Sequence, residues 1–119
     1  MMSNKTVLQD KSFEFSTRLL RFAGSIELTM ATKVIVGQLV RSGMSIGANI
    51  AEAQGSSSRR EYTNYFHIAL KSAGETSYWL KLLLYELSQK KEEIERLLSS
   101  CQELAKMLTS AIMTLKGKK

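Results

Sequence analysis

Two groups of polar residues interrupt a chain that otherwise has the pattern of amphipathic helices, and both lie in the stretch MSIGANIAEAQGSSSRREY. The first group, Ser45, Asn49 and Glu52, recurs at helical spacing within an apolar run. The second group places Arg59 and Arg60 directly after three serines. Hydroxyl, amide and carboxylate groups hydrogen-bond neighbouring helices or ligands, whereas arginines beside serine hydroxyls suit phosphate or carboxylate groups.

The serine and arginine group has the pattern of a helix start. Ser58 is a suitable N-cap, and Glu61 stands three residues later, as in a capping box. Arg59 and Arg60 then occupy the first helical turn, where positive charge costs about 0.3–1 kcal/mol because the helix N-terminus is itself positive. Free amide donors, serine hydroxyls and two arginines together predict an anion site. The alternative is a solvated cap with incidental arginines.

The arc of Ser45, Asn49 and Glu52 admits two interpretations. In the first, it is a buried or half-buried polar seam, in which Asn49 and Glu52 hydrogen-bond neighbouring helices and fix their register. In the second, the same residues and Arg41 line a surface for a ligand or for nucleic acid.

The sequence offers little support for catalysis, for a metal site or for a cofactor. His67 is the only histidine, and Asn64 stands where a Glu-x-x-His metal pair would need a carboxylate. His67 is expected on the surface, and Cys101 at a core position where it is inert. The sequence contains no glycine-rich phosphate loop and no nucleophile elbow. We therefore expect a protein that is not an enzyme.

Composition favours a single all-α domain over residues 1–119. The chain is 44% hydrophobic and contains no proline, and its net charge is +6, of which three lysines lie in a basic tail at 116–119. Its single cysteine predicts a reducing compartment, and hence a cytoplasmic protein. No apolar run approaches the roughly 20 residues that cross a bilayer, so we expect no membrane contact.

Apolar periodicity predicts four helices, at about 10–27, 30–53, 58–87 and 90–115. Short connections make consecutive helices antiparallel neighbours, which gives an up-down-up-down four-helix bundle.

The second predicted helix has more apolar surface than a bundle requires. Apolar residues spread well beyond the stripe of about 100° that one bundle face needs, and Gly37, Gly43 and Gly47 suggest close approach of another backbone. In the third helix, Ile68, Trp79 and Leu82 lie off the main apolar face. Self-association through helices two and three would cover this surface.

The run QLVRSGMSIGANIAEAQGSSSRREYTNYFHIALKSAGETSYWLKLL resembles the signature of the bacterial four-helix-bundle proteins named for intervening sequences of 23S ribosomal RNA genes. The family pattern has an arginine, then S-I-x-x-N-I-A-E-G, a basic segment and F-x-x-x-A-x-x-S-x-x-E. The residues at these positions are Arg41, Ser45, Ile46, Asn49, Ile50, Ala51, Glu52, Arg59, Arg60, Phe66, Ala69, Ser72 and Glu75. Gly47 and Ala53 depart from the usual proline and glycine.

The resemblance implies a ring-like homo-oligomer, commonly a pentamer, and adds Ser72 and Glu75 to the polar seam. Relatives include the accessory variability determinant of diversity-generating retroelements, a basic ring that binds nucleic acid and a reverse transcriptase.

Two functions follow as expectations. The first is a nucleic-acid-binding or ribonucleoprotein accessory factor that contacts RNA or DNA, and possible partners include a nucleic-acid-processing protein. Its candidate phosphate contacts are Arg41, Arg59, Arg60, Lys71 and Lys81. The alternative is a protein-interaction scaffold that does not bind nucleic acid.

Overall fold

The computed structural model describes residues 4–117, with side chains from residue 7 onward, and over this range it is all-α. Four helices follow one another along the chain: α1 (Asn4–Gly24), α2 (Met30–Ala53), α3 (Arg59–Glu86) and α4 (Lys91–Leu115). A single 3₁₀ turn, Ser88–Lys90, joins α3 to α4. The prediction of an all-α chain with four helices is confirmed.

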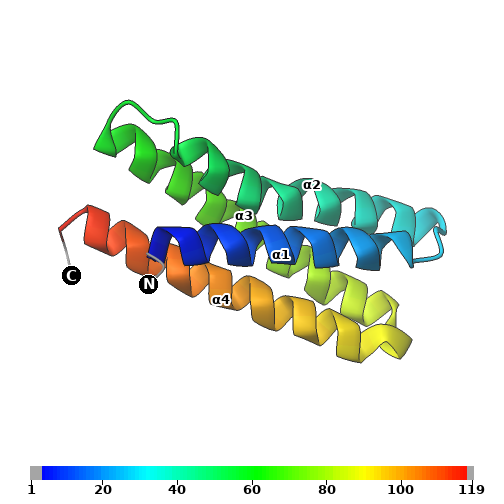
Figure 1. Ribbon diagram of the computed structural model, residues 1–119. Coiled ribbons are helices and arrows are strands. Elements are labelled where there is room, and N and C mark those ends of the chain that lie inside the picture. Colours follow the sequence, from blue (N-terminus) through cyan, green and yellow to red (C-terminus); the bar gives the residue numbers. More distant parts are fainter. Residues whose placement is uncertain (1–3, 118–119) are drawn as a thin grey trace.

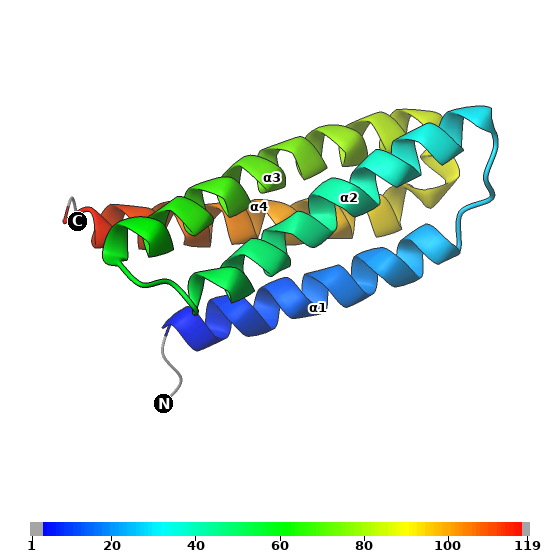
Figure 2. The same cartoon turned by 90° about the horizontal axis from the view of Figure 1, so that it is seen from above.

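Consecutive helices run antiparallel and form one elongated bundle (Figure 1). Helix α2 packs against α3, α3 packs against α4, and α1 packs along both α2 and α4 (Figure 2). The α2–α3 turn therefore lies at the same end of the bundle as the C-terminus of α4 (Figure 1). The α1–α2 connection lies at the opposite end.

The predicted helix limits are correct for α2 and within one residue for α3 and α4, but the prediction for α1 is wrong at both ends. Helix α1 begins at Asn4 rather than near residue 10, because Leu8 continues the buried stripe seven residues ahead of Phe15. It ends at Gly24 rather than at residue 27, although Ile26 is still buried beyond the last turn. Of the predicted basic tail, Lys118 and Lys119 lie outside the described residues.

Side-chain caps fix the starts of the two central helices. Helix α2 begins with a capping box between Thr29 and Thr32, which was not predicted from the sequence. At α3, Ser58 Oγ accepts a hydrogen bond from the Glu61 N–H at 3.0 Å, as predicted. The Glu61 carboxylate accepts from the Ser57 N–H at 2.8 Å instead of completing the capping box on Ser58. These contacts set the orientation of the first turn of α3.

The core follows the predicted helical periodicity. Phe15 and Leu19 of α1 pack with Leu39 and Ile46 of α2, and all four side chains are buried. Helix α4 buries one continuous stripe: Ile94, Leu97, Cys101, Leu104, Leu108 and Ile112. Together these side chains supply a large part of the hydrophobic stabilisation, since each fully buried Leu, Ile or Phe is worth about 1.5–3 kcal/mol.

Two of the three helical glycines in α2 serve packing within a single chain. A Cβ atom at Gly43 would collide with Cδ2 of Leu19, and one at Gly47 would lie 3.3 Å from Ser16 Oγ. These glycines let α1 approach α2 closely, so they do not count as evidence for contact with a second copy. Gly37 has nothing within 4 Å of its would-be Cβ and remains unexplained by the bundle.

The solvent side of α2 nevertheless carries the predicted excess of apolar surface. Met30 is 90% exposed and Val34 is 62% exposed, and Ala48 and Ala51 are exposed further along. With Gly37 and half-buried Met44, these residues form a stripe with alternating spacings of three and four, broken only by Arg41. We call this stripe the α2 outer face. Such spacing is typical of a helix that packs along another helix.

Cys101 is buried in the core, as predicted. Burial raises the pKa of its thiol, and a hydrogen bond from Ser77 Oγ to Sγ, at 3.6 Å, offsets only part of that effect. We expect the thiol of the folded protein to react with a disulfide reagent at pH 8 about 100-fold or more slowly than in the urea-unfolded chain, because the thiolate forms only on opening. Equal rates in the two states would contradict this burial.

Between residues 4 and 117, no helix combines the length and the apolarity that are needed to cross a bilayer.

Candidate nucleic-acid interface

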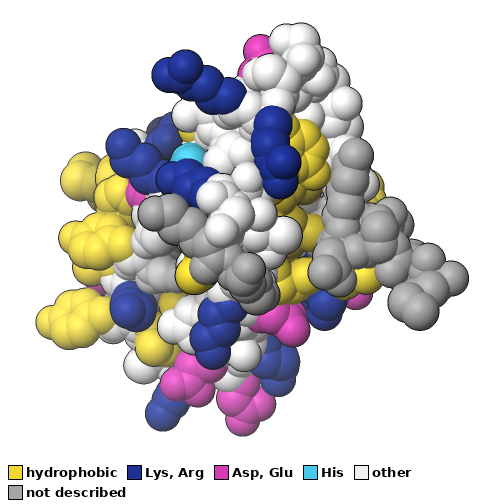
Figure 3. Space-filling model, turned by 90° about the vertical axis from the view of Figure 1, so that its left-hand side faces the viewer, with side chains coloured by type: hydrophobic (Ala, Val, Ile, Leu, Met, Phe, Trp, Pro, Cys, Tyr) yellow, Lys and Arg dark blue, Asp and Glu magenta, His cyan; other side chains and the backbone are white. Residues whose placement is uncertain are grey.

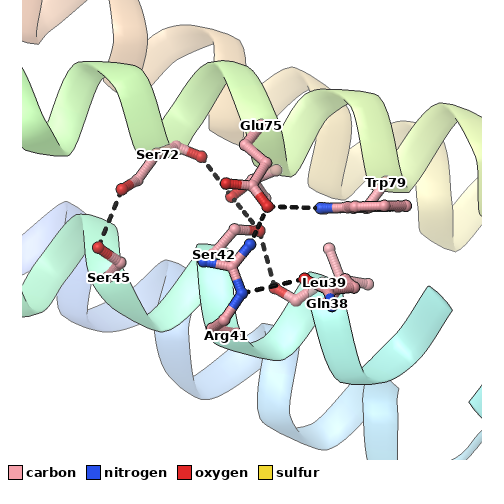
Figure 4. Close-up of polar contacts among 9 residues, drawn as sticks. Gln38, Leu39, Arg41, Ser42, Ser45, Ser72, Glu75 and Trp79 are labelled. Atoms are coloured by element: carbon pink, nitrogen blue, oxygen red, sulfur yellow. Dashed lines mark hydrogen bonds and ion pairs between the residues drawn. The ribbon is translucent and has the colours of Figure 1, made fainter. Parts of the chain in front are cut away.

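A polar seam runs between α2 and α3 (Figure 4). Ser45 Oγ lies 2.9 Å from Ser72 Oγ across the two helices. One turn away, the Arg41 guanidinium pairs with Glu75, whose Oε2 also accepts a hydrogen bond from Trp79 Nε1 at 2.9 Å. The structure thus brings together four of the residues singled out in the sequence.

The seam continues into the core through the hydroxyls of Ser42 and Thr76. The Thr76 hydroxyl lies 3.0 Å from Ser42 Oγ and 2.7 Å from the carbonyl oxygen of Ser72. Both residues are fully buried. Buried hydroxyls must find partners, so this pairing fixes the register of α2 against α3.

Asn49 and Glu52 do not bond a neighbouring helix as the seam hypothesis expected. Asn49 Nδ2 donates to the Ser45 carbonyl at 2.8 Å and to Ser45 Oγ at 3.0 Å, within α2. Glu52 is exposed, and its side chain makes no hydrogen bond or ion pair with another described residue. Glu52 lies in the last turn of α2, next to the α2–α3 connection, beyond the cross-helix contacts of Arg41 and Ser45.

Arg41 is committed to the seam. Besides its ion pair with Glu75, its Nε donates to Gln38 Oε1 at 3.0 Å. A guanidinium held by two side chains contributes less to phosphate binding than a free one, because those contacts must be exchanged. We therefore assign Arg41 to joining α2 and α3.

Arg59 and Arg60 lie on an open hollow of about 840 Å³ at the end of the bundle. The N-cap Ser58 and, within α3, Asn64 and His67 line the same hollow. Lys116, at the end of α4, lines its other side. We call it the cationic hollow; Figure 3 shows lysine and arginine side chains gathered around the histidine at this end. From the sequence Lys116 was expected in a basic tail, whereas the antiparallel packing brings it to the start of α3.

The electrostatics of the cationic hollow favour anions. Arg59, Arg60 and Lys116 are exposed, and they adjoin the positive end of the α3 dipole. Among the described residues that line the hollow, Glu61 is the one carboxylate, and it accepts a hydrogen bond from the Ser57 N–H at 2.8 Å. Three cations against one acid leave a net positive site that suits phosphate groups.

The remaining predicted contacts lie on α3 but outside the hollow. Lys71 and Lys81 are exposed on the same side of the helix as Arg60 and His67. At a rise of about 1.5 Å per residue, Lys81 lies about 32 Å along the axis from Arg60. The predicted cations therefore do not form one compact site.

A smaller hollow lined by cations, about 350 Å³ in volume, lies where α1 and α4 meet at the other end of the bundle. Arg18, Arg21, Lys90 and Arg96 line it, together with Glu93. Arg18 Nη1 donates to Ser100 Oγ at 2.9 Å, so one of these cations already joins the two helices. This group cannot be seen in the sequence alone, because its members come from segments far apart in the chain.

Across residues 4–117, no three His, Cys, Asp or Glu side chains gather as ligands of a metal ion would.

Comparison with known proteins agrees with the bundle architecture. The chain is 38% identical to a protein of unknown function from the S23 ribosomal protein family of Bacteroides thetaiotaomicron, whose crystal structure is known. The two structures match with a TM-score of 0.85, over 92% of this chain and 98% of that one. A search of curated proteins found no match. The model of the 23S rRNA-intervening sequence protein family matches residues 4–110, nearly the whole chain. The chain therefore belongs to the 23S rRNA-intervening sequence protein family.

Proposed function

We propose that this protein is a non-enzymatic, self-associating accessory factor that binds nucleic acid through the cationic hollow. The observation that supports the proposal is that Arg59, Arg60 and Lys116 line one hollow at the N-terminus of α3. Phosphate is the abundant polyanionic group that such a site fits. The single thiol suits a reducing cytoplasm, where nucleic acid is available.

Self-association supports this function by multiplying the site. The α2 outer face exposes the apolar side chains of Met30 and Val34 in a single chain, and a second copy is the partner that carries a complementary stripe. A ring of copies, with a pentamer favoured, would present several cationic hollows to one polymer. Binding at linked sites raises the overall affinity without any new contact.

Nucleic-acid binding is tested by fluorescence anisotropy with a labelled RNA hairpin and a labelled DNA duplex over a range of salt concentrations. We expect the double variant Arg59→Ala, Arg60→Ala to bind about tenfold or more weakly at low salt. The slope of log K against log salt should fall by about one for each lost phosphate contact. Both arginines are exposed, so the fold should be unaffected.

The matched control removes two charges elsewhere. Lys91 and Lys106 of α4 are exposed and do not line the cationic hollow, and the variant Lys91→Ala, Lys106→Ala has the same net charge as the arginine double variant. Its affinity should stay within about twofold of the wild type. An equal loss in both variants would show that net charge alone governs binding. No binding by the wild type at low salt would contradict the proposal and favour the scaffold function.

A further inference from the structure

One side of α3 carries a continuous exposed stripe in which cations alternate with aromatic rings. Its charged or aromatic members are Arg60, His67, Lys71, Tyr78, Lys81 and Tyr85, and all of them are exposed. These residues recur at alternating spacings of three and four, and Asn64 and Gly74 occupy the two remaining positions of the pattern. No position of the stripe therefore holds an acidic residue. We call it the α3 stripe. It begins on the rim of the cationic hollow at Arg60 and His67.

The tyrosines of the α3 stripe do not serve the bundle core. Tyr78 is 59% exposed and Tyr85 is 86% exposed. The Tyr78 ring makes an edge-to-face contact with Trp79, at a centroid distance of 5.1 Å, and Trp79 is held by Glu75. Tyr78 is therefore supported from one side while much of its surface remains open. In Figure 3, hydrophobic side chains project beside lysine and arginine side chains at the left of the view.

The three carboxylates of α3, Glu61, Glu75 and exposed Glu86, lie beside the stripe and occupy none of its positions. Glu75 pairs with Arg41 on the side toward α2, and Glu61 accepts a hydrogen bond from the Ser57 N–H. Among the described residues, Arg60, Lys71 and Lys81 form no ion pair, so the stripe complements a polyanion. A polymer that follows it would meet cations and rings in turn.

We infer that the α3 stripe binds single-stranded nucleic acid, with its bases stacked on Tyr78 and Tyr85 and its phosphates held by the flanking cations. The inference rests on the proposed nucleic-acid function and names the form of the polymer. A duplex keeps its base faces stacked inside, where a tyrosine ring cannot reach them, whereas a single strand offers every base face. From Arg60 to Tyr85 the stripe is about 38 Å long, which is room for roughly 11 nucleotides at a stacked spacing of about 3.4 Å.

The test compares a labelled 12-nucleotide single strand with the same sequence as a duplex. We expect the variants Tyr78→Leu and Tyr85→Leu each to weaken single-strand binding about tenfold, because leucine keeps apolar surface but has no ring to stack on a base. Duplex binding should stay unchanged in both variants. Phe13→Leu is the matched control: Phe13 is 72% exposed on α1, away from the stripe, and its loss should not change either affinity.

Three outcomes would overturn the inference. If the tyrosine variants bind the single strand like the wild type while the Arg59→Ala, Arg60→Ala variant does not, the inference fails and the proposed function stands. If a tyrosine variant lowers the particle mass in light scattering, the stripe is a contact between copies. If the wild type binds neither probe, the proposed function and this inference fail together.

Discussion

Replacing Gly43 by leucine is expected to lower the free energy of unfolding by about 3 kcal/mol or more. Gly43 is buried where α1 crosses α2, and even a Cβ atom there would collide with Cδ2 of Leu19. Leu19 is itself fully buried, so its side chain has no free space to move into. A leucine at position 43 must separate the two helices or distort the core. Urea denaturation followed by circular dichroism measures the effect.

The control for this prediction is the same substitution at an open glycine. Gly74 lies within α3, is exposed, and has nothing within 4 Å of its would-be Cβ. Gly74→Leu should raise the free energy of unfolding by about 0.5–1 kcal/mol, because glycine is a poor helix former. Equal effects of the two substitutions would show that α1 does not press on α2 at Gly43.

Introducing two acidic residues on the α2 outer face is expected to reduce the assembly to a single chain of 13.4 kDa. The variant is Val34→Glu, Ala48→Glu, at two exposed positions of the apolar stripe. Glutamate is a good helix former, so the isolated bundle should keep its stability. In an assembly the added carboxylates would be desolvated and would face like charges from a second copy, which costs several kcal/mol for each contact. Multi-angle light scattering at micromolar concentration gives the mass.

A matched variant separates the α2 outer face from apolar exposure in general. Phe13 and Leu20 of α1 are 72% and 54% exposed, and Phe13→Glu, Leu20→Glu adds the same charge outside α2. This variant should keep the mass of the wild type. Dissociation of both variants would place the contact elsewhere or spread it over several helices. A wild-type mass of 13.4 kDa would remove the basis for self-association altogether.

If both the nucleic-acid and the assembly predictions hold, binding and self-association use different helices. The α2 outer face would join copies, and the cationic hollow with the α3 stripe would remain open to the polymer. The polar seam lies between these two surfaces and ties them together through Ser45, Ser72, Arg41 and Glu75. A change in the seam is therefore expected to disturb both activities.

The sequence by itself determined the features that depend on one helix at a time. The limits of α2, the N-cap at Ser58 and the buried stripe of α4 follow from residues a few positions apart. Helical periodicity is local, so a single segment shows which of its faces is apolar. The excess apolar arc of α2 was visible for the same reason. The start of α1 was missed because one buried residue, Leu8, decides whether the first turns belong to the helix.

Only the tertiary structure decided which residues from different helices meet. Arg41 became a partner of Glu75, 34 residues away, and Lys116 joined Arg59 and Arg60 on the cationic hollow. Gly43 and Gly47 turned out to serve the contact with α1 rather than a second copy. These outcomes depend on the rotation and spacing of packed helices, which are set by the fit of many side chains at once. The sequence of a single helix shows which of its residues could contact neighbouring helices. The packing of the whole bundle determines which of those contacts form.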